Sequence, residues 1–198
     1  MADRFEKRAR ETGLVVVGRE SVGADVEDFL PLLARIRSLK PDLVYCGGTT
    51  QTLSQLVWAL LAADAAPRFL VPEGCREQAF IDVVGAERAQ GRCFFSSSGL
   101  PDEKVRDFYP EFANPFKASR DRSAHAVYGY EAARVVFNAI AKTGTKDREA
   151  LRAAVLATRD FDSPLGRWSF DEHGVTTLKT TAIYGVRSGK FELLGMIE

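Results

Sequence analysis

The chain has 198 residues, and 27 Lys and Arg are balanced by 27 Asp and Glu. This length predicts one large domain or two small ones. The balanced charge argues against nucleic acid or an anionic membrane surface as the main partner, because both require a basic excess. The most apolar stretch, Leu56 to Ala66, is too short to span a membrane. The first residues, MADRFEKRARETG, contain no signal peptide for export.

Helices and short apolar strands alternate over the first 98 residues. The pattern predicts a helix over 3–12, ended by Gly13 and followed by a β-branched strand over 14–17. Three more helices are expected: one between Asp28 and Pro41, one capped by Thr49 or Thr50, and one over about 76–84. Strands are expected over 43–46, 69–71 and 92–96. Because the repeat opens on a helix, we expect the chain to begin within a domain.

The expected strands are apolar throughout, which is typical of strands buried on both faces. They favour an α/β fold: three α/β/α layers around a mostly parallel sheet. After residue 98 the pattern changes, and helices are expected near 102–112, 122–142 and 147–157. A short strand, RWSF at 167–170, lies between turn signals, and two final strands are joined at Ser188 and Gly189. The change near residue 98 is the best candidate for a crossover between two lobes.

Ligands of open parallel sheets bind beyond the carboxyl ends of the strands. The segment VYCGGTT at 44–50 ends a predicted strand there. Gly47 and Gly48 allow a ligand to approach the backbone, and the hydroxyl of Thr49 or Thr50 can donate a hydrogen bond to it. A tight turn with an ordinary helix cap explains the same residues, so both interpretations stay open.

The segment FLVPEGC at 69–75 ends the next predicted strand and carries a carboxylate. Glu73 follows Pro72 at the edge of the sheet, with Gly74 behind it. A carboxylate there can pair with a ligand ammonium, a charge-assisted bond of about 1.5–3 kcal/mol when it is shielded from water. The alternative is a solvated glutamate in a loop.

Catalytic, metal and cofactor sites are not indicated. His125 and His173 lack a partner motif, and Asp171 to Gly174 is interpreted as a turn rather than a calcium loop. Cys46, Cys75 and Cys93 are odd in number and lack metal-ligand spacing, which favours structural thiols. One disulfide, between Cys46 and Cys75, is the alternative.

Several segments, taken in order, resemble a known family. They are DFLPLLARIRSLKPDLVYCGG, the PEG that contains Glu73, YGYEAARVVFNAIAKTG, FDSPLGRWSFDEHG and the terminal YGVRSGKFELL. Their order and spacing resemble the C-terminal portion of type I periplasmic binding proteins. Within that family they are most similar to the leucine/isoleucine/valine-binding subunits of ABC transporters, and the resemblance covers essentially the whole chain.

The resemblance implies two α/β lobes that close over a ligand about a hinge. Residues 1–98 correspond to the second ligand-binding lobe without its first strand. Residues 99–180 correspond to the segment that returns to the first lobe, and residues 181–198 to the return strands. Most of the first lobe has no counterpart in the chain.

The implied function is that of a non-enzymatic, periplasmic or extracellular solute-binding protein that serves an ABC transporter permease and needs no cofactor. Glu73 matches the acid that holds the ligand ammonium, with Gly48, Thr50 and Gly74 around it. Thr49 stands where amino-acid binders often carry an aromatic residue, so a small carboxylate-bearing solute stays open beside a branched-chain amino acid. A ligand-sensing regulator, or a remnant without binding activity, is the alternative.

Two expectations follow from the partial match to the family. With one wall of the cleft, the chain alone is expected to bind solute weakly or not at all. Residues 99–180 are expected to expose apolar surface, which favours a homodimer or an exchange of elements between protomers.

Overall fold

The structure is a computed structural model that describes residues 2–23, 26, 28–63, 67–101, 104 and 124–197. The chain divides into two compact units. The first comprises Met1–Ser97 and Ile183–Gly195, and the second comprises Ser98–Ala182 and Met196–Glu198.

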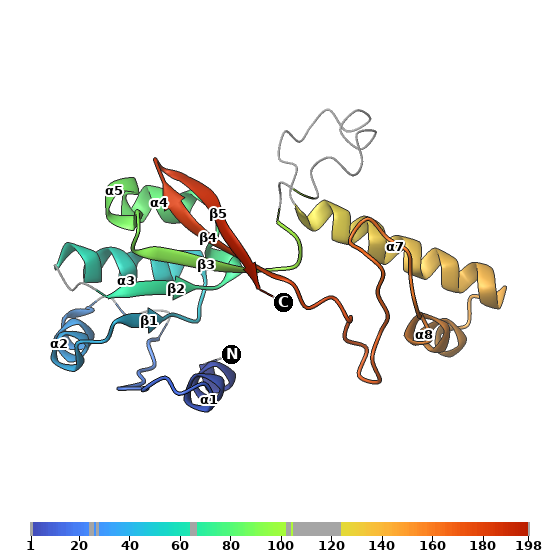
Figure 1. Ribbon diagram of the computed structural model, residues 1–198, viewed down its shortest axis with the longest axis horizontal. Coiled ribbons are helices and arrows are strands. Elements are labelled where there is room, and N and C mark those ends of the chain that lie inside the picture. The colour runs from blue at the N-terminus through green and yellow to red at the C-terminus, as the bar shows by residue number, and fades with distance from the viewer. Residues whose placement is uncertain are drawn as a thin grey trace. The chain divides into compact units, whose positions relative to one another are not determined.

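The first unit is built on a mixed five-stranded sheet (Figure 1). Its strands stand in chain order: β1 (Leu43–Tyr45), β2 (Arg68–Val71), β3 (Cys93–Ser98), β4 (Thr181–Arg187) and β5 (Lys190–Ile197). β1, β2 and β3 are parallel, and Val71 of β2 is the register partner of Phe95 in β3. The predicted α/β class and the parallel arrangement of these three strands are confirmed.

The turn between β4 and β5 lies where the sequence predicts it. Ser188 and Gly189 both have positive φ, 49° and 73°. Positive φ at both central residues is the geometry of a two-residue type I′ hairpin, which matches the natural twist of paired strands. Ser188 also donates its backbone N–H to the side-chain oxygen of Gln90, at 3.1 Å.

The first strand is preceded by α1 (Ala2–Glu11) and α2 (Leu30–Leu39). The parallel strands are connected by α3 (Thr50–Ala62), between β1 and β2, and by the 3₁₀ turn η1 (Glu73–Cys75), α4 (Gln78–Val84) and α5 (Ala86–Ala89), between β2 and β3. α3 packs against α4. At the centre of the core, the ring of Phe95 lies edge-to-face with those of Phe80 and Phe191, with centroids 5.2 and 5.0 Å apart. Phe80 and Phe95 are fully buried.

The end of α1 follows from its glycine. Gly13 has a φ of 83°, its N–H bonds to the carbonyl of Arg10 at 3.1 Å, and the N–H of Leu14 bonds to that of Ala9 at 2.9 Å. These two bonds form a Schellman motif, in which glycine adopts the left-handed conformation at low cost. The predicted C′ role of Gly13 is confirmed.

The strand predicted over 14–17 is wrong. Residues 14–20 are not part of the sheet, and the side chain of Val15 is 85% exposed. The N–H of Leu14 is used to close α1. High β-propensity favours a strand only where a neighbouring strand offers hydrogen bonds and side-chain contacts, and the described sheet ends at β1 without including this segment.

Among its described residues, the second unit contains two helices that pack on each other, α7 (Ala124–Thr143) and α8 (Arg148–Leu156). Gly144 ends α7 with a φ of 62°, and the Asp147 carboxylate caps α8 by accepting the N–H of Ala150 at 2.8 Å. None of the described helices is long and apolar enough to cross a membrane. The helix predicted near 102–112 lies outside the described residues, apart from Lys104.

α7 is apolar on more than one side. It buries a stripe of residues spaced by four: Val127, Glu131, Val135 and Ala139. The Glu131 carboxylate is paired with Arg134 at 2.8 Å. Val136, Phe137 and Ile140 are exposed, as expected for residues 99–180.

The strand predicted at RWSF is also wrong. Residues 161–176 form only isolated antiparallel bridges, between Phe161 and Trp168 and between Phe170 and Thr176. The aromatic rings pack on each other instead: the ring centroid of Trp168 lies 5.2 Å from that of Phe161 and 5.0 Å from that of Phe170. Tight turns on both sides fold the segment back on itself, so a continuous series of backbone hydrogen bonds between two strands does not form.

Candidate functional site

The predicted site residues lie on two loops at the carboxyl ends of β1 and β2. The hydroxyl of Thr50, in the first turn of α3, donates to the carbonyl of Gly74 at 2.8 Å. The thiol of Cys75 lies 3.7 Å from the carbonyl oxygen of Gly48. These two contacts join the loop after β1 to the loop after β2.

The two neighbouring threonines have different environments. Thr49 is the N-cap residue of α3, but its side chain makes no capping hydrogen bond and is exposed. Thr50 is half-buried and holds Gly74. Thr50 therefore ties the loops together, while Thr49 presents its hydroxyl to solvent.

Gly48 lies directly over the side chain of Leu53. A Cβ added at Gly48 would stand 3.1 Å from Cγ of Leu53, closer than ordinary packing allows. Leu53 is buried. The absence of a side chain at Gly48 thus lets the loop lie close to the core.

Glu73 stands at the start of η1, two residues beyond the end of β2. The N–H of Cys75 bonds to the carbonyl of Pro72 at 2.9 Å, and the N–H of Arg76 bonds to that of Glu73 at 2.8 Å. These bonds fix a compact turn. The side chain of Glu73 is half-buried, and its Oε1 accepts a hydrogen bond from the hydroxyl of Ser97 at 2.9 Å.

Ser97 is a site residue that the sequence reasoning missed. It lies near the end of β3 and is buried, with 5% of its surface exposed. The available signal was the register: Glu73 and Ser97 each stand two residues beyond the paired Val71 and Phe95. Arg76 is a second missed neighbour, and its guanidinium carbon lies 4.4 Å from the centroid of the buried Tyr184 ring.

The three cysteines are free and buried. Burial raises the pKa of Cys46 and of Cys93 to about 12. Burial also raises the pKa of Cys75, to about 11, although a hydrogen bond with Thr50 acts in the opposite direction. The alternative disulfide between Cys46 and Cys75 is not present, since both residues are free cysteines. The raised pKa values keep the thiols protonated at neutral pH.

The other candidates for chemistry are a metal site, the carboxylate of Asp171 and the two histidines. Within the part of the chain that the structure describes, no three His, Cys, Asp or Glu side chains are placed to hold a metal ion. Asp171 accepts the backbone N–H groups of Val175 and His173, at 2.8 and 2.9 Å, and these bonds lower its pKa. His173 is exposed in this turn, and His125 lies in the first turn of α7.

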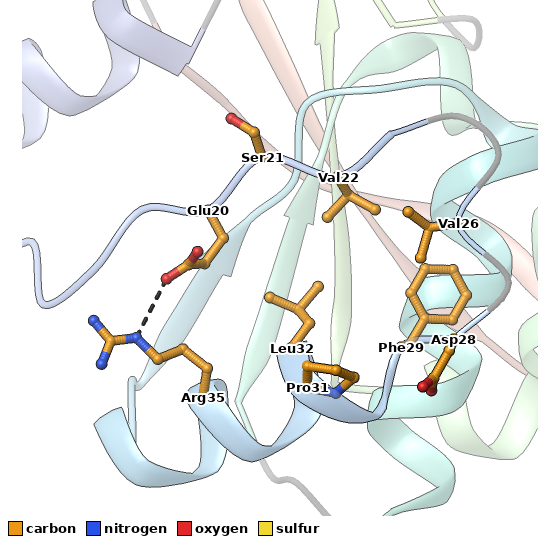
Figure 2. Close-up of a pocket in the computed structure, with 9 residues that line it drawn as sticks. All are labelled: Glu20, Ser21, Val22, Val26, Asp28, Phe29, Pro31, Leu32 and Arg35. Carbon is orange, nitrogen blue, oxygen red and sulfur yellow. Dashed lines mark hydrogen bonds and ion pairs between the residues drawn. The ribbon is translucent and has the colours of Figure 1, made fainter.

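A separate hollow of about 500 Å³ lies between α2 and the segment that precedes it (Figure 2). An exposed ion pair, Glu20 with Arg35 at 3.2 Å, lies at its rim. The remaining lining residues are Ser21, Val22, Val26, Asp28, Phe29, Pro31 and Leu32. None of the five predicted site residues lines this hollow.

Comparison with known proteins shows which family the chain resembles. A family model described as periplasmic binding protein matches residues 1–190. The Leu/Ile/Val-binding protein BraC3 of Rhizobium johnstonii is 26% identical over 196 residues, which are 96% of this chain and 51% of that protein. The leucine-, isoleucine-, valine-, threonine- and alanine-binding protein of Pseudomonas aeruginosa is 27% identical over 181 residues, 88% of this chain and 46% of that protein.

A solved structure agrees with the fold. The leucine-binding protein of Thermotoga maritima superposes with a TM-score of 0.84 at 23% sequence identity, covering 100% of this chain and 56% of that one. The chain therefore spans about half the length of the proteins it matches.

Proposed function

Because this chain belongs to the periplasmic binding protein family, we propose that it binds a small ammonium-bearing solute beside Glu73. The family is one of solute-binding proteins rather than enzymes. The observation that carries the proposal is the half-buried Glu73 carboxylate, held by Ser97 at the carboxyl end of parallel strands. A partly shielded carboxylate pairs with an ammonium group by a bond of about 1.5–3 kcal/mol.

The names of the relatives suggest the solute. Both are binding proteins for branched-chain amino acids, and the Pseudomonas protein is also named for threonine and alanine. We propose a branched-chain amino acid or a related small solute. Thr49, Gly48 and Gly74 are exposed on the same two loops as Glu73, and in this proposal they favour polar groups on the solute.

The proposal extends to location and partners. We propose that the chain acts in the periplasm or outside the cell and delivers its solute to the permease of an ABC transporter. In this proposal residues 1–98 form the ligand-binding lobe, residues 99–180 belong to the other lobe of the family fold, and residues 181–198 form return strands. Because the chain spans about half of its relatives, we expect millimolar binding by the chain alone, which corresponds to about −4.1 kcal/mol.

The test is an NMR titration of the ¹⁵N-labelled chain with leucine, valine and alanine. We expect saturable shifts of the amides of Gly48, Thr49 and Gly74. Glu73→Gln should abolish them, because it replaces the charged partner by a neutral one of the same shape. 4-Methylpentanoate, which is leucine without its ammonium group, should bind more weakly and produce smaller shifts at the same concentration.

The matched control is Glu77→Gln, which removes an exposed carboxylate four residues along the chain. This variant should keep the leucine response. A leucine response that persists in Glu73→Gln, or an equal response to 4-methylpentanoate, would contradict the proposal.

A further inference from the structure

Ser97 is a buried residue in direct contact with the Glu73 carboxylate. β2 and β3 are parallel, and their register ends with the pair Val71 and Phe95. Two residues beyond this pair, the Ser97 hydroxyl of β3 donates to Oε1 of Glu73, at the start of η1, at 2.9 Å. The contact therefore joins the end of β3 to the turn that follows β2.

We propose that Ser97 is a positioning residue that fixes the direction of the Glu73 carboxylate and thereby sets the selectivity of the site for an ammonium group. This inference rests on the proposed function of Glu73. The serine side chain is 5% exposed and has one hydroxyl proton, which it gives to Glu73. A carboxylate has about four acceptor positions, so the bond to Ser97 orients it while leaving acceptor capacity for other donors.

Orientation matters because a glutamate side chain has several rotatable bonds. A solute that binds to a mobile carboxylate must also order it, and this ordering weakens the observed affinity. Ser97 orders Glu73 before the solute arrives. The cost of ordering one such side chain on binding changes an equilibrium constant by about tenfold or less.

The serines of this strand supply a matched control. Residues alternate between the two faces of a strand, so Ser96 points to the face opposite Ser97. Ser96 is half-buried. Ser97→Ala and Ser96→Ala therefore each remove one serine hydroxyl, at adjacent positions. Of the two, Ser97→Ala is the variant that removes the contact with Glu73.

The first measurement needs no ligand. Side-chain ¹³C relaxation and three-bond couplings of Glu73 report whether its side chain occupies one rotamer. We expect one dominant rotamer in the unmodified chain, in Ser96→Ala and in Ser97→Thr, which retains a hydroxyl. We expect rotamer averaging in Ser97→Ala. An unchanged Glu73 in a folded Ser97→Ala variant overturns the proposal.

The second measurement is selectivity. The ratio of leucine affinity to 4-methylpentanoate affinity should fall by up to about tenfold in Ser97→Ala and recover in Ser97→Thr. Equal ratios in the unmodified chain and in Ser97→Ala also overturn the proposal. If no amino acid binds the unmodified chain, the proposed function fails, while the rotamer measurement still decides whether Ser97 positions Glu73.

Discussion

The hydroxyl of Thr50 donates a hydrogen bond to the backbone carbonyl of Gly74 at 2.8 Å, which ties the first turn of α3 to the loop that carries Glu73. Thr50 is the first residue of α3, directly after the N-cap residue Thr49. Its hydrogen bond spans 24 residues of sequence. The shape of the candidate site thus depends on a contact between two loops of the sheet edge.

Removal of the Thr50 hydroxyl should loosen this edge. Thr50→Val keeps the volume of the side chain and loses the donor. We expect a loss of about 0.5–1.5 kcal/mol in the free energy of unfolding, measured by urea denaturation. Thr50→Ser should retain most of the stability, and equal losses in both variants would show that the bond to Gly74 contributes nothing.

The aromatic core of the first unit should respond far more strongly. Phe95 is fully buried between Phe80 and Phe191. Phe95→Ala should lower the free energy of unfolding of this unit by about 3–5 kcal/mol, because it removes buried surface and leaves a cavity. Phe137→Ala is the control, since this side chain is 68% exposed and its loss should change stability by about 0.5 kcal/mol or less.

How far the sequence predicts this fold is clearest at its strands. The apolar runs that become β1, β2 and β3 each pair with a neighbouring strand of the sheet, so composition and spacing suffice to find them. The run at 14–17 has the same composition and forms no strand, because strand formation also depends on a neighbour that local sequence does not specify. The RWSF segment fails for a different reason, because tight turns on both sides limit its pairing to isolated bridges.

The site shows a similar limit. Glu73, Gly74 and Thr50 can be selected because they follow predicted strands whose carboxyl ends meet at one edge of the sheet. Ser97 belongs to a run of three serines, Ser96 to Ser98, which look alike in the sequence. Only the register between β2 and β3 distinguishes the middle serine from its neighbours.

Two glycines with positive φ should tolerate substitution differently. Gly13 has a φ of 83° with no atom within 4 Å of an added Cβ, so Gly13→Ala should cost only the backbone term, about 1–2 kcal/mol. Gly99 has a φ of 93°, and an added Cβ would collide with the hydroxyl of Tyr128. That hydroxyl accepts the N–H of Leu100 at 3.0 Å, so the ring cannot move without losing this bond.

We therefore expect Gly99→Ala to destabilise the second unit by more than Gly13→Ala destabilises the first. Thermal unfolding of the two variants, followed by tryptophan fluorescence and circular dichroism, gives the comparison. Similar losses in both would mean that the contact with Tyr128 imposes no constraint.

The buried thiols should make stability fall at alkaline pH. An exposed cysteine in the unfolded chain has a pKa of about 8.5, whereas burial raises that of Cys46 to about 12. Below about pH 8.5 both states are protonated, and the thiol contributes no pH dependence. Between about pH 8.5 and 12 the unfolded state has lost a proton that the folded state retains, so each such thiol lowers stability by about 1.4 kcal/mol per pH unit.

Cys46→Ala isolates this contribution from the other groups that titrate in the same range. Its free energy of unfolding, measured by urea denaturation from pH 8 to 10, should decline less steeply than that of the unmodified chain. The thiol of the folded chain should also react slowly with a disulfide reagent at pH 8, since the reactive thiolate is scarce there and the side chain is buried. Parallel stability curves for the two proteins, together with fast labelling of Cys46, would show that this thiol is solvated and ionises normally.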